Sequence, residues 1–407
     1  MKLLQINVSA NWGSTGKIAE QIGECALAHG WESYIAYGRS SNKSKSHLIR
    51  IGSKAGQAWH LIISRLYDMH GLGSRLATKR LIRKIEEIKP DIIHLHNIHG
   101  YYINYKLLFE YLNSIDTPIV WTLHDCWSFT GHCAHFVEAE CNKWQKECGN
   151  CKLLAKYPRA FMDNSRRNHI IKRGLFTKAN VTIVPVSNWL SNYVHNSFLS
   201  SKHCVVIHNG VNIDTFRPID ANTDSKKNIL GVSSVWDDSK GLSDFYKLRS
   251  MLPTSIYNIT LVGLTKAQIN NLPDGIIGIE RTNNVEELVQ LYNRANAFVN
   301  PTYADTFPTT NLEAIACGTP VITYKTGGSP ESISVNTGIV VEQGDIDGLA
   351  QAIKTICNNG KDYYRDACRE HALRHFDKTT CFEKYIELYD NILTKKYNHN
   401  TNCNETK

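Results

Sequence analysis

The chain has 407 residues, which at roughly 150 residues per domain predicts two or three domains. Hydrophobic residues make up 42% and charged residues 21%, which is typical of globular proteins and excludes collagen-like and low-complexity chains. The longest apolar runs are strand-sized, far short of the roughly 20 residues of a membrane helix. The apolar start of the chain is too short for a signal peptide, so we expect a first strand and a cytoplasmic protein.

The net charge of +8 is unevenly distributed along the chain. Residues 1–200 carry 25 Lys and Arg against 14 Asp and Glu, whereas the remaining residues are slightly acidic. The basic residues concentrate in two stretches, Arg75 to Lys89 and Lys152 to Lys178. This asymmetry suggests an anionic partner, such as a membrane surface, a nucleic acid or a phosphorylated substrate. A solvated basic helix face explains the same pattern and stays open.

Strand-like and helix-like segments alternate through the first half of the chain. The predicted strands are Lys2–Val8, Trp31–Tyr37, Asp91–Leu95, Pro118–Leu123, Val181–Pro185 and Val205–Ile207. The predicted helices include Thr15–Ala28 and Arg75–Ile88, the latter ending before Pro90. Such alternation indicates a parallel sheet with helices on both faces.

The same pattern restarts in the second half. The predicted strands are Asn228–Ser233, Tyr257–Val262, Ala297–Asn300, Val321–Thr323 and Gly338–Val340. The predicted helices are Leu242–Ser250, Val285–Ala295, Thr310–Ala316 and a last one at Thr380–Leu393. Two doubly wound halves predict two Rossmann-like domains, joined near residues 209–224, where Gly, Pro, Asn and Asp cluster. The polar tail 397–407 is expected to be disordered.

A first candidate phosphate loop lies between the first strand and the first helix, at residues 11–17. Gly13 and Gly16 allow a close backbone approach at a helix N-terminus. A nucleotide-binding loop of the Walker type needs Gly at position 11 and Ser or Thr at 18, but Asn11 and Ile18 stand there. An ordinary tight turn explains this loop equally well.

A second candidate loop places two carboxylates around a strand-to-helix turn. Asp305 precedes the predicted helix and Glu313 lies in its first turns. The free amides at the helix start can bind phosphate, Glu313 can accept two hydrogen bonds from a ribose, and Asp305 can hold sugar hydroxyls. Taken singly, each acid is better explained as a helix cap or a solvated side chain.

The whole string from Asp305 to Glu331 resembles the retaining glycosyltransferases of family 4. Its Asp305-x7-Glu313 pattern is similar to their E-x7-E motif with Asp in place of the first Glu, and residues 314–321 and 327–331 continue the likeness. Residues 207–212 and 216–218 resemble the same family, so the likeness covers essentially the whole chain. It implies a GT-B architecture, with two Rossmann-like domains facing a central cleft.

The resemblance also implies a division of labour between the domains. Residues 1–212 would form the acceptor domain, 213–379 the nucleotide-sugar domain, and a last helix at 380–395 would pack back on the first. The residues expected at the donor are Gly13, Gly16, Asn209, Gly210, Lys240, Thr306, Phe307, Thr309, Thr310, Asn311, Leu312 and Glu313.

Lys240, Asp305, Glu313 and His124 are the expected catalytic residues. Lys240 would offset the charge on the leaving diphosphate. Many relatives carry an Arg a few residues earlier, but residues 233–235 here are Ser-Ser-Val. His124 ends a predicted strand, where parallel sheets bind ligands, and would orient a hydroxyl of the donor sugar. His96 is expected on the acceptor side.

Four cysteines form a separate candidate metal site. Cys133, Cys141, Cys148 and Cys151 are separated by seven, six and two residues, and four thiolates suit a structural zinc ion. His132 and His135 are alternative ligands, and reduced, metal-free thiols explain the pattern equally well. Catalysis itself is expected to need no cofactor.

The sequence therefore predicts a retaining glycosyltransferase that moves a sugar from a UDP- or GDP-linked donor to a saccharide acceptor. The resemblance implies a lipid-linked acceptor and surface polysaccharide biosynthesis. The basic stretches at Arg75–Lys84 and Arg166–Arg173 would hold the protein to the inner face of an anionic membrane. A sugar-nucleotide hydrolase, epimerase or phosphorylase on the same fold and a basic nucleic-acid-binding protein are the alternatives. The latter is disfavoured because the basic stretches lack interleaved aromatic residues, so no nucleic acid is expected.

Overall fold

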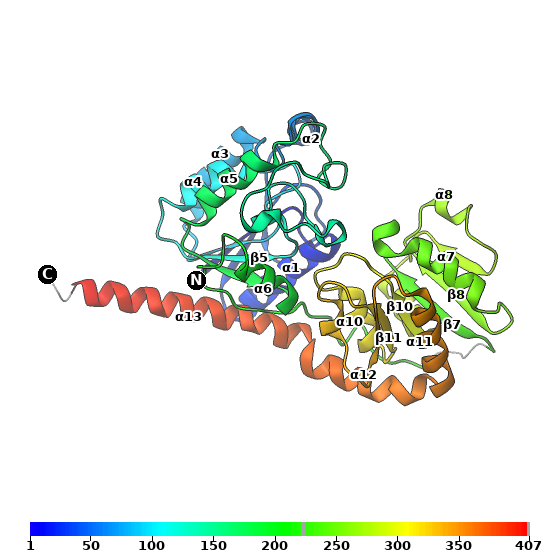
Figure 1. Ribbon diagram of the computed structural model, residues 1–407. Helices are drawn as coiled ribbons and strands as arrows, with labels where there is room; N and C mark the ends of the chain where they lie inside the picture. Colours follow the sequence, from blue (N-terminus) through cyan, green and yellow to red (C-terminus); the bar gives the residue numbers. More distant parts are fainter. Residues whose placement is uncertain (221–224, 405–407) are drawn as a thin grey trace. The chain divides into compact units, whose positions relative to one another are not determined.

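The computed structural model describes residues 1–220 and 225–404, with the backbone alone for 397–404. The chain forms two compact units (Figure 1). Unit 1 comprises Met1–His208 and the chain from Phe382 onward, and unit 2 comprises Asn209–Cys381. The change from unit 1 to unit 2 falls at Asn209, at the start of the predicted join.

Unit 1 is a six-stranded parallel sheet with the strand order β3-β2-β1-β4-β5-β6. Its strands are β1 (Lys2–Asn7), β2 (Glu32–Tyr37), β3 (His47–Arg50), β4 (Ile92–Leu95), β5 (Ile119–Leu123) and β6 (Val181–Pro185). Its helices are α1 (Gly13–Ala28), α2 (Lys54–Tyr67), α3 (Arg75–Ile88), α4 (Tyr105–Leu112), α5 (Ser165–Phe176) and α6 (Asn188–His195). Three 3₁₀ turns, η1 (Trp127–Phe129), η2 (Val137–Ala139) and η3 (Lys143–Gln145), lie in the long segment between β5 and α5.

Successive side chains of β5 point to opposite faces of the sheet of unit 1, and helices cover both faces. Trp121 packs against Phe109 of α4 and Phe176 of α5. The neighbouring Thr122 points to the opposite face and bonds to the hydroxyl of Tyr385 from the last helix. Because both faces are covered, β4 and β5 are buried along their whole length and are mostly apolar, as is typical of parallel sheets.

Two details of unit 1 differ from the prediction. Strand β3 was not predicted, because its residues are largely exposed and lack an apolar alternation. The predicted strand Val205–Ile207 is wrong: these residues run beside β6, donating N–H groups to the carbonyls of Ile183 and Pro185, but form no strand. Pro185 has no N–H with which to continue the ladder.

Unit 2 repeats the architecture with the strand order β12-β11-β10-β7-β8-β9, again all parallel. Its strands are β7 (Lys227–Val232), β8 (Tyr257–Val262), β9 (Ile276–Ile279), β10 (Ala297–Asn300), β11 (Val321–Tyr324) and β12 (Gly338–Val341). Its helices are α7 (Leu242–Met251), α8 (Lys266–Ile269), α9 (Val285–Arg294), α10 (Thr309–Ala316), α11 (Ile346–Asn359) and α12 (Lys361–His375), and its 3₁₀ turns are η4 (Asp238–Lys240) and η5 (Ser329–Ser332).

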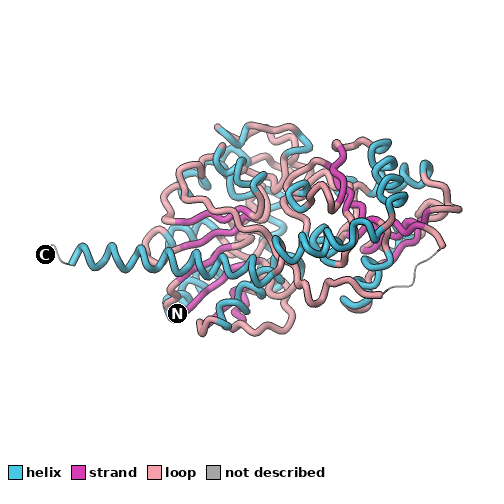
Figure 2. The backbone as a smooth tube through the Cα atoms, turned by 90° about the horizontal axis from the view of Figure 1, so that it is seen from below, coloured by secondary structure: helices cyan, strands magenta, loops and turns pink. Residues whose placement is uncertain are grey.

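The last helix, α13 (Lys378–Asn404), begins in unit 2 and belongs to unit 1 from Phe382 onward. It lies along the sheet of unit 1 (Figure 2). The Tyr389 hydroxyl lies 2.7 Å from His94 of β4, and Glu383 lies 2.7 Å from His29. The helix passes the predicted end at Leu393, so the predicted tail 397–407 is helical as far as Asn404, and its last three residues lie outside the described residues. Among the described residues, no helix is both long and apolar enough to cross a membrane.

Candidate functional site

The lysine predicted for the diphosphate ends a tight turn at the carboxyl end of β7. The Asp237 side chain caps this turn by accepting the Lys240 N–H at 3.2 Å. Gly241 follows with a φ of +73°, and a Cβ at this position would lie 2.3 Å from the Pro301 carbonyl oxygen. Only glycine fits there, so local geometry fixes the glycine that follows Lys240.

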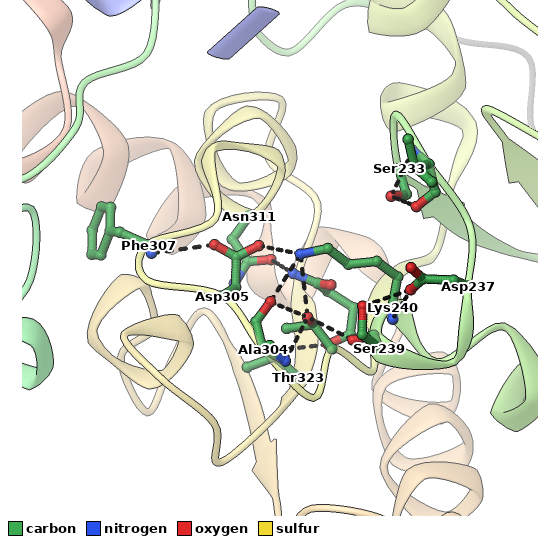
Figure 3. A network of polar contacts seen from close by, with 12 residues as sticks. Ser233, Asp237, Ser239, Lys240, Ala304, Asp305, Phe307, Asn311 and Thr323 are labelled. Atoms are coloured by element: carbon green, nitrogen blue, oxygen red, sulfur yellow. Dashed lines mark hydrogen bonds and ion pairs between the residues drawn. The ribbon is translucent and has the colours of Figure 1, made fainter. Parts of the chain in front are cut away.

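Lys240 and Asp305, predicted separately, form an ion pair (Figure 3). The Lys240 Nζ lies 2.8 Å from Asp305 Oδ2 and also donates to the Ala304 carbonyl at 3.0 Å. The side chains are 30% and 24% exposed, so both groups remain open to a ligand. One cation and one carboxylate therefore lie together at this edge of the sheet.

The loop that carries Asp305 is supported by a glycine pair. The Asp305 carbonyl accepts the N–H of Gly328 at 3.3 Å, and a Cβ on Gly327 would lie 1.7 Å from that carbonyl oxygen. The Phe307 N–H donates to the Asp305 carboxylate at 3.3 Å. The family resemblance includes Gly327 and Gly328, but their role in holding this loop was not predicted from the sequence.

Helix α10 presents its N-terminus beside this carboxylate. Pro308 precedes the helix, and no side chain among the described residues caps it. The Asn311 N–H donates to the Pro308 carbonyl at 3.2 Å, which leaves the amides of Thr309 and Thr310 for an anion. Thr309 and Thr310 are partly exposed at this end. Glu313 accepts a 2.9 Å hydrogen bond from the hydroxyl of buried Tyr292, which fixes one carboxylate oxygen.

Other residues of the predicted donor stretch turn inward. Asn311 bonds to Asn300 and Ser332, and the side chains of Phe307, Leu312 and Thr306 are buried. Their side chains support the loop and the core.

Asn209 and Gly210 lie next to the loop that carries Asp305 and the start of α13. Asn209 donates to the Phe307 carbonyl at 3.3 Å. Gly210 lies against the start of α13, where a Cβ would be 2.5 Å from the Cα of Lys378. These contacts give both residues a supporting role.

In unit 1, His96 and His124 meet at the carboxyl ends of β4 and β5. His96 Nδ1 lies 3.2 Å from His124 Nε2, and His96 Nε2 lies 3.0 Å from Gln5 Oε1. Because the Gln5 amide nitrogen donates to Ala19, its oxygen faces His96, which must then donate from Nε2. A neutral His96 accepts at Nδ1, so His124 donates from Nε2. Burial lowers the pKa of His96 well below its usual value and that of His124 to about 4, so both rings are neutral near pH 7.

Another buried histidine, His94, links β4 to helix α13. His94 Nδ1 lies 2.7 Å from the Tyr389 hydroxyl, and His94 Nε2 lies 2.8 Å from Thr122 Oγ1, which also bonds to Tyr385. The partners are 295 and 263 residues apart in sequence, so no local pattern could reveal them.

A small cavity of about 10 Å³ opens beside His124, lined by residues 96–99, 121–125, 127 and 128. On its wall His99 lies 2.9 Å from Asp125. Burial opposes ionisation of Asp125, but His99 and the Trp127 N–H hold its pKa at about 2. The cavity has room for about one water molecule.

The first predicted phosphate loop starts helix α1. Gly13 has a φ of +65° and open space around it. Gly16 is packed closely, because a Cβ there would lie 2.7 Å from the Ser9 hydroxyl. Gly16 is therefore restricted to glycine by packing, Gly13 has room beside it, and the donor contacts of both stay predictions.

The four cysteines lie in the segment between β5 and α5. The thiols of Cys133 and Cys151 are hydrogen-bonded, which raises the pKa of Cys133 and lowers that of Cys151 to about 7. The Gly131 N–H donates to the Cys148 sulfur at 3.2 Å. Among the residues whose side chains are described, no group of three or more His, Cys, Asp or Glu is arranged to hold a metal ion. The structural zinc stays a prediction.

Comparison with known families gives two matches that meet at residue 215. The model described as Glycosyltransferase Family 4 matches residues 17–215, and the model described as glycosyl transferases group 1 matches residues 215–374.

Curated relatives extend the likeness over the chain. WcaC of Escherichia coli (strain K12), described as a colanic acid biosynthesis glycosyl transferase, is 23% identical over 416 residues, covering 96% of this chain and 100% of that protein. The N,N'-diacetylbacillosaminyl-diphospho-undecaprenol alpha-1,3-N-acetylgalactosaminyltransferase of Campylobacter jejuni is 26% identical over 215 residues, covering 47% of this chain and 55% of that protein.

Solved structures share the fold at low sequence identity. Sucrose-phosphate synthase from Thermosynechococcus elongatus aligns with a TM-score of 0.73 at 18% identity, covering 97% of this chain and 99% of that one. HepE from Anabaena, solved in complex with UDP, aligns with a TM-score of 0.64 at 15% identity, covering 96% and 100%. The predicted GT-B architecture is confirmed.

Proposed function

The chain belongs to glycosyltransferase family 4 and is a glycosyltransferase, and on that premise we propose the reaction it performs. It transfers a sugar from a nucleoside diphosphate sugar to a saccharide carried on a lipid diphosphate, in the assembly of a surface polysaccharide. The observation that carries this proposal is the Lys240–Asp305 pair beside the uncapped N-terminus of α10.

The charges of this pair suit a nucleoside diphosphate sugar. Lys240 and the first amides of α10 attract the diphosphate, and the ammonium group offsets the charge that develops on it as the glycosidic bond breaks. Asp305 would repel the phosphates, so its carboxylate belongs with the sugar hydroxyls. Glu313 has one oxygen fixed by Tyr292 and accepts from the ribose hydroxyls with the other.

His124 acts in this proposal as a neutral group. With its pKa near 4, it bears no charge at neutral pH and can orient a hydroxyl of the donor sugar without acting as a cationic acid. The anomeric configuration is retained, by departure of the diphosphate and attack on the same face, and no metal takes part.

The relatives support the acceptor class. The name of the Campylobacter protein specifies a diphospho-undecaprenol-linked acceptor. The Escherichia coli relative and the capsular polysaccharide biosynthesis glycosyltransferase CapM of Staphylococcus aureus are named for surface polysaccharides. A lipid diphosphate acceptor would also account for the basic excess of residues 1–200.

The first test is thermal unfolding with UDP, GDP, ADP or CMP at millimolar concentration. A nucleotide at about 100 times its dissociation constant stabilises the folded state by roughly 2.7 kcal/mol, which raises the midpoint by several degrees. We expect one nucleotide to give this shift and Lys240→Ala to abolish it. Glu313→Gln keeps the bond from Tyr292 and should weaken the shift. Lys247→Ala, at an exposed lysine in α7, is the control.

The second test measures the product with the nucleotide sugars of the base so identified. Transfer to a lipid-linked saccharide with retained anomeric configuration, read by nuclear magnetic resonance, is the expected result. Release of free sugar or an epimerised nucleotide sugar, with acceptor present, would establish the hydrolase or epimerase instead. Absence of both a nucleotide shift and a transfer product would overturn the proposal.

A further inference from the structure

Helix α2 exposes an apolar stripe that no described residue covers. Trp59, Ile62 and Leu66 are 62%, 48% and 42% exposed and lie three and seven residues apart, which places them on one face of the helix. The helix contains no Asp or Glu. Phe161 lies at the end of this helix, where its N–H donates to the Arg65 carbonyl, and its side chain is also exposed. An exposed apolar face of this kind marks an interaction surface.

A groove of about 910 Å³ lies between α2 and α3. Its lining includes the apolar residues Ile49, Ile51, Ile63, Leu72 and Leu81. Leu76, in the first turn of α3, is 73% exposed and also lines it. The groove is thus continuous with the apolar stripe of α2, because Trp59 contributes to both.

Cations surround the same groove. Its lining contains Arg50, Arg75, Arg80, Arg83 and Lys84 but only one acid, Glu87. Among the described residues, Lys84 is the only one of these five cations with a carboxylate partner. Four guanidinium groups therefore stand beside apolar side chains with their charges uncompensated.

The other basic stretch, Arg166–Arg173 of α5, offers fewer free charges, and its contact with lipid stays a prediction. Lys172 is fully buried and donates to the carbonyls of Trp127 and Thr130. Arg166 is paired with Glu147. Arg167 and Arg173 of this stretch are exposed, so it presents two arginines, against the four that line the groove between α2 and α3.

We propose that α2, α3 and Phe161 form a docking surface for an anionic lipid bilayer. Trp59, Leu76 and Phe161 insert among the headgroups, and the arginines of α3 bind lipid phosphates. Exposed aliphatic side chains beside uncompensated arginines complement a bilayer, which offers an apolar interior below a layer of phosphates. Nucleic acid offers phosphates but no such interior. The proposal rests on the proposed function, in which the acceptor is held in a membrane, but binding is measurable without any transfer.

The experiment is flotation of the full chain with vesicles of phosphatidylcholine, with and without phosphatidylglycerol. We expect binding to the anionic vesicles that weakens with salt. Arg80→Gln with Arg83→Gln removes two cations and should weaken binding roughly 30-fold at about fivefold per charge. Trp59→Ser with Leu76→Ser should abolish flotation with either vesicle.

Matched controls come from unit 2. Val335→Ser with Tyr363→Ser replaces equally exposed apolar residues, and Lys266→Gln with Arg294→Gln removes two exposed cations. Both double variants should float like the unaltered chain. The proposal is overturned if the chain fails to float with anionic vesicles, or if these controls lose as much binding as the variants in α2 and α3.

The nucleotide-induced thermal shift separates this proposal from the proposed function. Variants of the docking surface should keep that shift while losing flotation. If the chain shows the nucleotide-induced shift but does not bind vesicles, only the proposed docking surface is refuted. If the chain floats with vesicles but binds no nucleotide, only the proposed function is refuted.

Discussion

His60 of α2 is expected to make the first unit sensitive to acid. Its ring is fully buried, and its Nε2 accepts the N–H groups of Gly71 at 3.2 Å and Gly73 at 3.0 Å. Its Nδ1 lies 2.9 Å from the Ser74 hydroxyl. A ring that accepts at Nε2 must be neutral, so protonation breaks both bonds to the loop that joins α2 and α3.

The size of this loss of stability follows from the shift in the pKa of His60. Burial lowers the pKa of His60 to about 4, against about 6.5 in the unfolded chain. The unfolded state therefore binds the proton more readily, and the stability that the neutral ring contributes is complete above the unfolded pKa and falls as the pH drops from 6.5 to 4. Between pH 7 and pH 5 the loss is about 2 kcal/mol for this one group. Burial also lowers the pKa of the nearby His70, which adds to the loss.

Hydrogen exchange of the peptide that spans residues 69–76 measures this effect at its origin. We expect its protection, corrected for intrinsic exchange, to fall by about 2 kcal/mol or more between pH 7 and pH 5. His60→Gln should remove about 2 kcal/mol of this pH dependence, whereas His195→Gln, at an exposed position, should leave it unchanged. An equal fall in the unaltered chain and in His60→Gln would refute the reasoning.

Three further outcomes are expected. Tyr389→Phe leaves His94 Nδ1 buried without its partner and should lower the free energy of urea unfolding by about 1–3 kcal/mol, whereas no change would show that water replaces the hydroxyl. Asp305→Asn should change stability by less than about 1 kcal/mol, because its ion pair is partly exposed, while slowing transfer about tenfold to hundredfold; an unchanged rate would exclude a contact with the sugar. A structural zinc in the cysteine cluster predicts about one zinc per chain by elemental analysis, lost in Cys148→Ser, and a content below about 0.2 would contradict it.

The alternation of strands and helices was readable from the sequence because most strands are buried on both faces. Such strands stand out as short apolar runs between helical patterns. The two unpredicted strands, β3 and β9, lie at the edges of their sheets, and most of their residues are not buried. An edge strand with a solvated face and, in β9, a glycine at 278 carries too weak a pattern to recognise.

The residues of the candidate site were predicted one by one from the sequence, but the contacts between them were not predicted. Lys240 and Asp305 are 65 residues apart, and only the sheet order β10-β7 brings the ends of their strands together. His96 and His124 follow adjacent strands, so their contact could have been derived once β4 and β5 were paired. The hydrogen bond between Tyr389 and His94 could not have been derived from the sequence, because nothing in the helix pattern of α13 specifies which strand this helix covers.

The two units supply different kinds of polar group, and this difference bears on the chemistry. Unit 2 offers a cation and carboxylates that are partly open to solvent, which suits the recognition of a charged nucleoside diphosphate. Unit 1 offers His96, whose acceptor role at Nδ1 requires a neutral ring, and His124, which burial keeps neutral. His124 is neutral because burial lowers its pKa to about 4, and its Nε2 donates to His96. In the proposed reaction, Lys240 of unit 2 would offset the charge that develops on the leaving diphosphate. His124 would contribute a fixed dipole, whose direction is set through His96 by Gln5.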